Sequence, residues 1–341
     1  MSKNLILVTG GAGFIGTHIL VELIKANYEV LVLDNFSNSS IHSISQVEKI
    51  TGTHINYVHG DIRDKNILKQ LFSLHKISSV IHLAGLKAVG ESVLKPIDYY
   101  DNNVCGTIAL IETMEAFGVR RIIFSSSATV YGSPTNLPIN EESPLVQPTN
   151  PYGRSKLFIE NILSDKFVSN KDWSIVNLRY FNPIGAHPSG LIGEDPKNLP
   201  NNIMPIITQC AIGKIPKISI FGDDYDTPDG TGIRDYIHVV DLARGHVAAL
   251  NYSQSTNQLI SINLGTGKGY SVLELIKTFR EVNNTELNYE IKPRREGDVS
   301  ACYSDPGLAK KILKWEAHHN LEDMCRHSWN FQKKNPTGFN T

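Results

Sequence analysis

Tyr152 and Lys156 stand four residues apart where the sequence predicts the start of a helix, directly after Pro151. A spacing of four places both side chains on one face of the helix. An ammonium beside a phenol stabilises the phenolate and so lowers the pKa of the tyrosine. A phenol tuned towards neutral pH can act as a general base or a general acid. Taken alone the YxxxK pattern is weak evidence, because it occurs by chance in many helices.

Three serines, Ser125 to Ser127, end an apolar run that begins at Arg121. We expect this run to be a strand of a parallel sheet, and open α/β sheets bind their ligands beyond the carboxyl ends of the strands. The hydroxyl of Ser127 could then share or relay a proton with Tyr152. The alternative is that the serines form only a turn. Together Ser127, Tyr152 and Lys156 make a candidate catalytic group.

A glycine-rich segment follows the first apolar run. Residues 5–8 lead into TGGAGFIG, which carries Gly10, Gly13 and Gly16 and precedes a segment with helical spacing. In such a strand–turn–helix unit the first glycine allows a tight turn, the second lets the backbone approach a pyrophosphate, and the third permits close helix–strand packing. The helix N-terminus presents free N–H groups to the anion. The segment predicts a dinucleotide-binding loop, with a purely structural turn as the alternative.

An acidic residue ends the second predicted strand. Asp34 lies at the distance from the glycine loop where a carboxylate binds the adenine ribose hydroxyls, and a 2′-phosphate would be repelled there. The sequence therefore favours NAD over NADP, with a helix or loop cap as the alternative role of Asp34. Asp61 and Ile62 follow the third predicted strand and lie either beside the adenine or in a plain turn. The positive nicotinamide ring of NAD would lower the pKa of Tyr152 further.

Short apolar runs alternate with longer amphipathic segments in the first half of the chain. Strands are expected at 5–8, 29–33, 56–59, 80–83, 121–125 and 174–179, and helices at 14–26, 65–75, 103–117 and 152–168. This alternation predicts an α/β fold with a doubly wound, Rossmann-like parallel sheet. After about residue 182, glycine, proline, asparagine and aspartate mark long loops, which are often functional. We expect residues 1–182, joined by 233–265, to form the NAD-binding domain, and 183–232 and 266–341 to form a smaller mixed α/β substrate-binding region.

The composition is that of a soluble globular enzyme. Of the 341 residues, 41% are hydrophobic and 20% are charged, and the formal net charge is -1. No global field attracts nucleic acid or an anionic membrane, so an anionic ligand needs local cations and amides. No apolar run could span a bilayer, and residues 5–8 are too short for a signal peptide. The four cysteines form no metal-binding pattern, so we expect no metal and a cytoplasmic location.

The order of glycine loop, serine, tyrosine and lysine resembles that of the extended short-chain dehydrogenase/reductase family, and further segments are similar to its UDP-hexose 4-epimerases. They span nearly the whole chain: VTGGAGFIG (8–16), HLAGLKAVGES (82–92), YYDNNV (99–104), FSSSATVYG (124–132), YGRSK (152–156), RYFNPIGAHPSG (179–190), NNIMP (201–205), GIRDYIHVVD (232–241) and PRREGD (293–298). The segments AGLKAVGES and RYFNPIGAHPSG are far more specific than the general family signature.

The resemblance implies two sets of binding residues. With the glycine loop, the set that contacts NAD is Phe14, Ile15, Asp34, Asn35, Phe36, Ser37, Asn38, Ser39, Asp61, Ile62, Leu83, Ala84, Gly85, Leu86, Lys87, Asn102, Tyr152, Lys156 and Phe181. The set that binds a UDP-sugar is Ser127, Asn182, Asn202, Ile203, Ser219, Ile220, Phe221, Arg234, Arg295, Glu296, Gly297, Asp298 and Cys302. Both arginines could fork onto a diphosphate. Their alternative is an exposed ion pair, for instance with Asp235 or Glu296.

One position departs from the family pattern. Four residues beyond Asp298, members restricted to UDP-glucose and UDP-galactose usually carry tyrosine, whereas this chain has Cys302. A small side chain would leave room beside the 2-substituent of the sugar, so the resemblance implies that N-acetylated sugars are accepted too. The alternatives are that the adjacent Tyr303 is the corresponding residue, or that Cys302 is an inert buried thiol.

The resemblance implies reversible C4 epimerisation of UDP-glucose and UDP-galactose through a 4-keto intermediate, with bound NAD. Tyr152 would be the base, Lys156 would lower its pKa and hold the nicotinamide ribose, and Ser127 would bridge tyrosine and substrate. A related 4,6-dehydratase is one alternative, although dehydratases usually carry an acidic pair where this chain has Ala128 and Thr129. A non-catalytic dinucleotide sensor is another, although sensing would need only the glycine loop. A homodimer paired through residues 103–117 and 152–168 is also implied.

Overall fold

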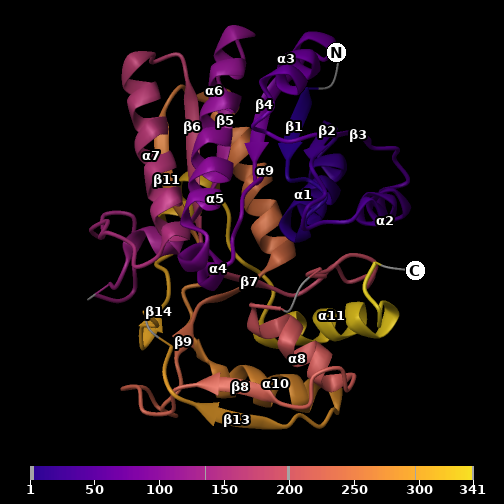
Figure 1. Cartoon of the computed structure of the whole chain (residues 1–341), viewed down its shortest axis with the longest axis vertical. Coiled ribbons are helices and arrows are strands. Elements are labelled where there is room, and N and C mark those ends of the chain that lie inside the picture. Colours follow the sequence, from indigo (N-terminus) through magenta and orange to yellow (C-terminus); the bar gives the residue numbers. More distant parts are fainter. Residues whose placement is uncertain (1–3, 135, 198–199, 296, 340–341) are drawn as a thin grey trace.

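The computed structural model describes residues 4–134, 136–197, 200–295 and 297–339, and a seven-stranded parallel sheet forms its centre (Figure 1). The strand order is β11-β6-β5-β4-β1-β2-β3. The bounds are β1 (Leu5–Thr9), β2 (Glu29–Asp34), β3 (Asn56–His59), β4 (Ile77–His82), β5 (Arg121–Ser127), β6 (Ser174–Tyr180) and β11 (Leu259–Leu264). The order reverses between β1 and β4, where a doubly wound sheet binds its ligand. The predicted Rossmann-like α/β fold is confirmed.

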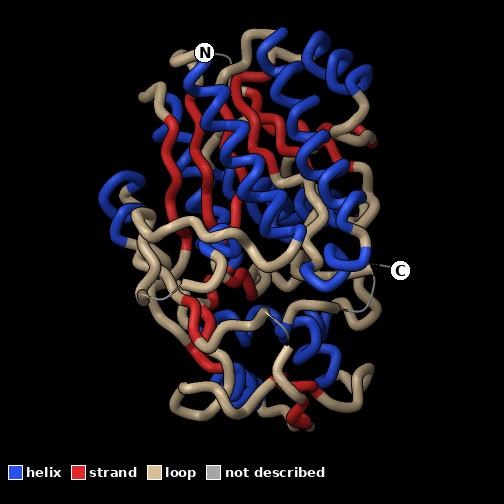
Figure 2. Tube along the Cα trace, turned by 60° about the vertical axis from the view of Figure 1, so that its left-hand side comes forward, coloured by secondary structure: helices blue, strands red, loops and turns tan. Residues whose placement is uncertain are grey.

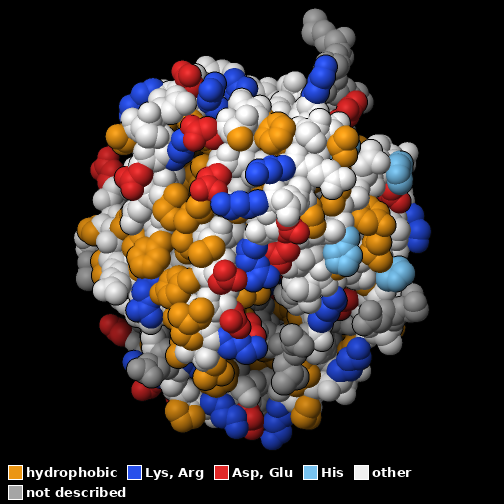
Figure 3. All heavy atoms as spheres, turned by 45° about the horizontal axis from the view of Figure 1, so that its top comes forward, with side chains coloured by type: hydrophobic (Ala, Val, Ile, Leu, Met, Phe, Trp, Pro, Cys, Tyr) orange, Lys and Arg blue, Asp and Glu red, His pale blue; other side chains and the backbone are white. Residues whose placement is uncertain are grey.

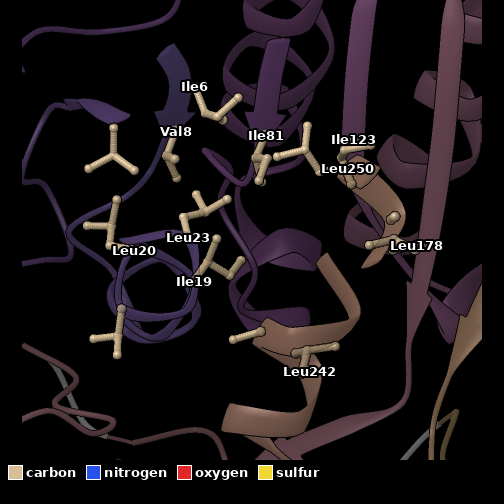
Figure 4. Packing of buried hydrophobic residues seen from close by; sticks show 14 of the residues in the cluster. Ile6, Val8, Ile19, Leu20, Leu23, Ile81, Ile123, Leu178, Leu242 and Leu250 are labelled. Carbon is tan, nitrogen blue, oxygen red and sulfur yellow. The ribbon is translucent and has the colours of Figure 1, made fainter. Parts of the chain in front are cut away.

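Helices cover both faces of the sheet, because successive side chains of a strand point to opposite faces. Ile6 and Val8 of β1 pack against α1 (Phe14–Lys25) and α9 (Val239–Ser255), as Figure 4 shows. Leu7, between them, packs in the cluster of α3 (Lys65–Leu74), α6 (Gly106–Ala116) and α7 (Pro151–Ser169) on the other face. Each such buried side chain contributes about 1.5–3 kcal/mol. The strand is a continuous apolar run because both of its faces are covered.

The remaining short elements of this half lie around the sheet. They are α2 (Ile41–Thr51), α4 (Val89–Leu94), α5 (Pro96–Tyr99), the π-helical turn η1 (Tyr100–Cys105) and the 3₁₀ turn η2 (Ala128–Tyr131). The helix predicted at 103–117 therefore begins inside the π-helical turn and continues as α6. Within the described residues, no helix combines the length and the apolar character needed to cross a bilayer.

A smaller mixed α/β region lies beyond the carboxyl ends of the sheet strands (Figures 1 and 2). Its helices are α8 (Ile203–Ala211), α10 (Val272–Asn283) and α11 (Leu321–Lys334), whereas the π-helical turn η3 (Ala309–Leu313) packs against α9 and β11 in the core of the large sheet. Its short strands are β7 (Asn182–Ile184), β8 (Ile218–Phe221), β9 (Ile233–Arg234), β10 (Tyr236–His238), β12 (Tyr270–Ser271), β13 (Tyr289–Lys292) and β14 (Ala301–Cys302). They form three small sheets: β10-β7, β12-β9-β14 and β13-β8. The core of this region includes Ile207, Ile218 and Phe279.

The chain returns to the large sheet after first leaving it. β11 pairs in parallel with β6 at the edge of the sheet, and α9, which precedes it, lies on α1. Residues 239–264 thus complete the sheet and one of its helical layers.

Candidate active site

The glycine loop joins β1 to α1 at the carboxyl edge of the sheet. Gly10 has a φ of +70°, and a Cβ there would lie 2.8 Å from the backbone nitrogen of Ala84. A Cβ on Gly16 would lie 2.5 Å from the carbonyl oxygen of Gly10, so both positions require glycine. Gly13 is the N-cap of α1, and no side chain of a described residue caps that N-terminus. The first N–H groups of α1 can therefore bind an anion such as a pyrophosphate.

Asp34 ends β2 beside this loop and hydrogen bonds to both neighbouring segments. One carboxylate oxygen accepts from the N–H of Ala12 at 3.0 Å. The other accepts from the N–H of Phe36 at 2.9 Å and from the hydroxyl of Ser39 at 2.8 Å. The capping role considered as an alternative is therefore real. It does not compete with ribose binding, because a carboxylate has about four acceptor positions.

The loop after β2 contacts the loop after β3. The amide of Asn35 donates to Asp61 at 3.0 Å, and Arg63 donates to both carboxylate oxygens of Asp61. These hydrogen bonds hold the pKa of Asp61 well below its usual range. The side chain of Ile62 is buried, and a Cβ on Gly106 of α6 would lie 2.6 Å from it. A contact of Ile62 with a cofactor would therefore come from its backbone.

Asn103 fixes the loop that follows β4, residues 83–87, and no motif in the sequence indicates this role. Its Oδ1 accepts from the N–H of Leu86 at 2.8 Å, and its Nδ2 donates to the carbonyl of Leu86 and to the hydroxyl of Ser155, each at 3.0 Å. A Cβ on Gly85 would lie 3.2 Å from Oδ1. The neighbouring Asn102, a predicted NAD contact, donates to the same Oδ1 at 2.9 Å.

Tyr152 lies in the first turn of α7, which Asn150 caps by accepting from the N–H of Gly153 at 2.9 Å. Burial raises the pKa of Tyr152, and this outweighs the hydrogen bond of Ser127 and the positive charge of Lys87, which lower it. The net direction is opposite to the one that the sequence predicts. The reason is that a phenolate inside the site is poorly solvated.

Lys156, the next residue of the candidate group, is buried and directed at β5. Its Nζ donates to the carbonyl of Ser125 at 2.7 Å and lies 4.9 Å from the ring centroid of Phe124. It lies 5.9 Å from the ring centroid of Tyr152. Burial lowers the pKa of Lys156 to about 8, although the charge of Glu160 opposes the shift. At neutral pH the side chain is an ammonium.

Ser127 completes the candidate catalytic group at the end of β5. Its hydroxyl accepts from the N–H of Thr129 at 3.2 Å and so caps the turn η2. The same side chain hydrogen bonds with Tyr152 and lowers the pKa of the phenol. The serine is therefore a turn cap and a partner of the tyrosine at once.

Lys87 and Asn202 both bind an acid that sequence reasoning missed. Oε1 of Glu194 accepts from Nζ of Lys87 at 3.0 Å and from Nδ2 of Asn202 at 2.6 Å. Burial lowers the pKa of Lys87, but the charge and hydrogen bond of Glu194 outweigh it, so the pKa is raised overall. Glu194 lies in a loop rich in glycine and proline, and nothing in the sequence of this loop indicates that the acid belongs to the site. Through this contact the loop after β4 is joined to the segment before α8.

Two arginines and an aspartate from separate segments come together in the smaller region. Asp298 lies 2.9 Å from Nε of Arg295 and 3.8 Å from Nη2 of Arg234. The guanidinium carbon of Arg295 lies 4.8 Å from the ring centroid of Phe221, which is 37% exposed. The group offers two cations and an accessible aromatic face. Gly297 lies in the same loop, with a φ of +83°.

The ion pair considered as the alternative for the arginines is present, but with Asp298 rather than Asp235. Arg234 and Arg295 pair with Asp298, whereas Asp235 accepts hydrogen bonds from Thr266 and Ser304. Glu296 lies outside the described residues.

The strand β8 places its three predicted contacts on two sides. Ile220 is buried in the core of the smaller region, so any ligand contact would come from its backbone. Ser219 and Phe221 lie on the opposite side, as the alternation of a strand requires. Asn182 begins β7 and Ile203 begins α8, with Asn202 as its N-cap.

Cys302 packs against the cluster that contains Phe181, Ala128 and Tyr131, and it lies opposite Arg234 in the β14–β9 ladder. It therefore stands between the turn that follows Ser127 and the cations of the smaller region. Burial raises the pKa of Cys302 to about 11, so it is a neutral thiol and no nucleophile.

A parallel sheet with a dinucleotide loop after β1, and with serine, tyrosine and lysine grouped at its carboxyl edge, defines an extended short-chain dehydrogenase/reductase. A family model described as GDP-mannose 4,6 dehydratase matches residues 7–328. The chain is 54% identical to UDP-glucose 4-epimerase of Dictyostelium discoideum over 335 residues, 98% of this chain and 97% of that protein. It is 53% identical to UDP-glucose 4-epimerase of Bacillus subtilis over 334 residues, 98% of each.

A solved structure agrees with these relatives. The crystal structure of UDP-glucose 4-epimerase from Bifidobacterium longum in complex with NAD+ and UDP matches with a TM-score of 0.96 at 53% identity, covering 98% of this chain and 100% of that one. The chain belongs to the UDP-glucose 4-epimerase family, so it is an enzyme of the isomerase class. The resemblance predicted from the sequence segments is confirmed.

Proposed function

We propose that this enzyme interconverts UDP-glucose and UDP-galactose by reversible inversion of carbon 4, with bound NAD as its cofactor. The observation that carries the proposal is the grouping of Ser127, Tyr152, Lys156 and Lys87 next to the loop after β4, which Gly10 of the glycine loop approaches closely. Residues 1–182 and most of 233–265 would bind NAD, whereas residues 183–232 and 266–341, together with Arg234 of β9, would bind the UDP-sugar.

The glycine loop and its neighbours fit a dinucleotide. The uncapped N-terminus of α1 suits the pyrophosphate, and Asp34 retains acceptor capacity for ribose hydroxyls. The loop at residues 83–87 and Phe181 would flank the nicotinamide end. Bound NAD would supply the oxidation of carbon 4 and its reversal within one catalytic cycle.

The catalytic group then has separate tasks. Tyr152 takes the proton of the 4-hydroxyl and returns it after the 4-keto sugar has presented its opposite face. Ser127 hydrogen bonds with the tyrosine and lowers its pKa together with the charge of Lys87. Lys156, fixed by the carbonyl of Ser125, holds the nicotinamide ribose. Because burial raises the pKa of Tyr152, these cations and the positive nicotinamide ring must offset the cost of a phenolate.

The smaller region holds the part of the substrate that must not move. Arg234 and Arg295 would bind the diphosphate bidentately, Phe221 would stack on the uracil, and Asp298 would accept the hydroxyls of the uridine ribose. The keto sugar could then turn about its phosphate linkage while the UDP group stays anchored.

The test is to incubate the purified enzyme with UDP-galactose and to identify the sugars formed. We expect UDP-glucose, with the same final ratio of the two sugars from either starting sugar. A 4,6-dehydratase would instead form a deoxy-keto sugar irreversibly, and a dinucleotide sensor would form no product. Tyr152→Phe should lower the rate by about 10²–10⁴-fold, and full activity of that variant would refute the assignment of the base.

We also propose that N-acetylated UDP-sugars are substrates, because Cys302 presents a small side chain beside Phe181 and Ala128. Incubation with UDP-N-acetylgalactosamine in parallel tests this. Conversion of UDP-galactose alone would contradict the role given to Cys302.

A homodimer through α6 and α7 is proposed as well. An apolar groove of about 280 Å³ lies between these helices and is lined by Ile108, Ile111 and Ile162. Nearby Phe158, 45% exposed, stacks on Tyr100. Figure 3 shows hydrophobic side chains gathered on the left of the view, the side where α6 and α7 lie. Ile108→Asp should yield monomers in sedimentation if the helices form the interface.

A cytoplasmic location remains a prediction. Its support is that the cysteines are free thiols, which suits a reducing compartment.

A further inference from the structure

A buried ion pair lies next to Lys156, between its helix α7 and strand β6. Glu160 lies on α7, one helical turn beyond Lys156, and Arg179 lies on the adjacent strand β6. Nε and Nη2 of Arg179 lie 3.0 and 2.7 Å from the two carboxylate oxygens of Glu160. Each side chain is 5% exposed. A bidentate pair with this burial has a fixed geometry and is little screened by solvent.

The pair is connected to the strand that carries the serines. The hydroxyl of Ser126 donates to Glu160, while the preceding carbonyl, that of Ser125, accepts from Lys156. Arg179 also donates to the hydroxyl of Tyr131 at 2.9 Å. The end of β5 is therefore fastened to α7 at two successive residues, directly before Ser127.

The charged and titratable groups that face Lys156 come from three elements. On its own helix they are Tyr152 and Glu160. On β4 it is His82, which stays neutral because burial, and then the charge of Lys156, lower its pKa to about 3. On β6 they are Arg179, behind Glu160, and Tyr180, which hydrogen bonds with Ser125 and whose pKa burial raises. The negative charge next to the ammonium is thus that of Glu160, and Arg179 limits its strength.

We propose that Glu160 and Arg179 form a positioning pair of the active site, in which Glu160 supplies the counter-charge of the Lys156 ammonium and Arg179 sets how strongly it acts. This rests on the proposed function, in which the charged lysine holds the cofactor and serves the tyrosine. The carboxylate also raises the pKa of Lys156 against the effect of burial. Neither residue touches the substrate or NAD in this scheme.

The test is the pH dependence of kcat for the holoenzyme, whose alkaline limb should report loss of the Lys156 proton. Glu160→Gln removes the negative charge and leaves Arg179 unopposed, so the pKa of Lys156 falls and the limb should move to lower pH by roughly half to one unit. Arg179→Met leaves the carboxylate unopposed, so the limb should move to higher pH. The double variant should return it close to its original position.

A merely structural pair would not give shifts of opposite sign. The dissociation constant for UDP should stay within about twofold in all three variants, because the pair lies on α7 and β6 of the large sheet, whereas Arg234 lies on β9 of the smaller region. Glu316→Gln, which breaks an exposed pair with Lys310, is the matched control and should leave the limb unchanged. If Glu160→Gln does not fold, the effect of Glu160 can be measured by comparing the alkaline limbs of Arg179→Met and the double variant, which differ only at Glu160. The double variant should fold, because removing both partners of a buried ion pair is often tolerated.

The outcomes separate the two proposals. A wild-type enzyme that converts no UDP-galactose refutes the proposed function. If the wild-type enzyme converts UDP-galactose but the alkaline limbs of all variants coincide or shift equally, only the positioning role of the pair is refuted and the proposed function stands.

Discussion

Nζ of Lys87 lies 3.0 Å from Oε1 of Glu194, and this contact joins the loop after β4 to the segment that leads into Asn202 and α8. It brings Lys87, a predicted NAD contact, and Asn202, a predicted contact of the UDP-sugar, onto one carboxylate. Because the charge of Lys87 also lowers the pKa of Tyr152, the contact holds in place a cation that favours ionisation of the proposed base.

Lys87→Met should raise the pKa of Tyr152, since the phenolate loses a cation that stabilises it. Tyr152 must be deprotonated to act, so the acid limb of kcat/KM should move to higher pH and the rate at neutral pH should fall about tenfold. Lys277→Met, at a position that is 76% exposed, is the matched control. An unchanged acid limb in Lys87→Met would contradict the coupling.

Gly16→Ala should abolish tight binding of NAD. The added Cβ would lie 2.5 Å from the carbonyl oxygen of Gly10 and 2.7 Å from Cα of Gly11, so the loop must move away from α1. Overpacking of this kind costs about 1–3 kcal/mol. NAD content of the purified protein and its thermal midpoint measure the effect. Gly90→Ala, where a Cβ would meet nothing within 4 Å, should retain both.

Cys302→Tyr should narrow the range of substrates. A larger side chain beside Phe181 would fill the space that we assign to the 2-substituent of the sugar. The ratio of kcat/KM for UDP-N-acetylgalactosamine to that for UDP-galactose should fall at least tenfold, while UDP-galactose is still converted. Cys325→Ser, a thiol buried in the core of the smaller region, should lower stability and leave the ratio unchanged.

Three imidazoles pack where α9 meets the segment around α11. The N–H of Val240 donates to Nδ1 of His238 at 3.0 Å, which leaves the proton of this ring on Nε2, 2.9 Å from Nδ1 of His327. His319 stacks on His238 and lies 2.9 Å from Asp241. With Nε2 of His238 as the donor, the three rings form a hydrogen-bonded cluster. If His327 were protonated, its Nδ1–H and the Nε2–H of His238 would be two donors facing each other without an acceptor between them.

Stability should therefore fall as the solution becomes acidic. Burial lowers the pKa of His238 and of His327 below the ordinary 6.5, so the unfolded chain binds these protons more readily than the folded one. The contribution to stability is present above about pH 6.5 and is lost as the pH falls below that value. The thermal midpoint should drop between pH 7 and pH 5, and His327→Asn should make the drop smaller. Equal slopes for both proteins would exclude His327 as a source.

The sequence predicts local structure best where only one residue type satisfies a constraint on the backbone. Gly10 and Gly16 could be predicted because no other residue fits a positive φ or a contact of 2.5 Å between Cβ and a carbonyl oxygen. The continuous apolar run of Ile6, Leu7 and Val8 predicts one buried strand, because both faces of a parallel sheet are covered. Its side chains then alternate between the two cores.

Contacts between distant segments could not be predicted in this way. Asn103 and Glu194 look like ordinary loop or helix polar residues, and their roles arise only when the fold sets them beside Leu86 and Lys87. The spacing of Tyr152 and Lys156 predicts a lowered pKa of the tyrosine, but it says nothing about burial, which determines the direction of the shift. Spacing also could not show that Ile220 turns into the core.

The placement of β11 at the open edge of the sheet has a consequence for biosynthesis. Its residues 259–264 leave the ribosome long after β6, with which they pair, and α9 covers α1 only once residues 239–255 exist. A chain stopped near residue 182 would present an unprotected strand edge, which invites pairing with other chains. The sheet formed by the first half of this protein is therefore complete only after residues 239–264 have been synthesised.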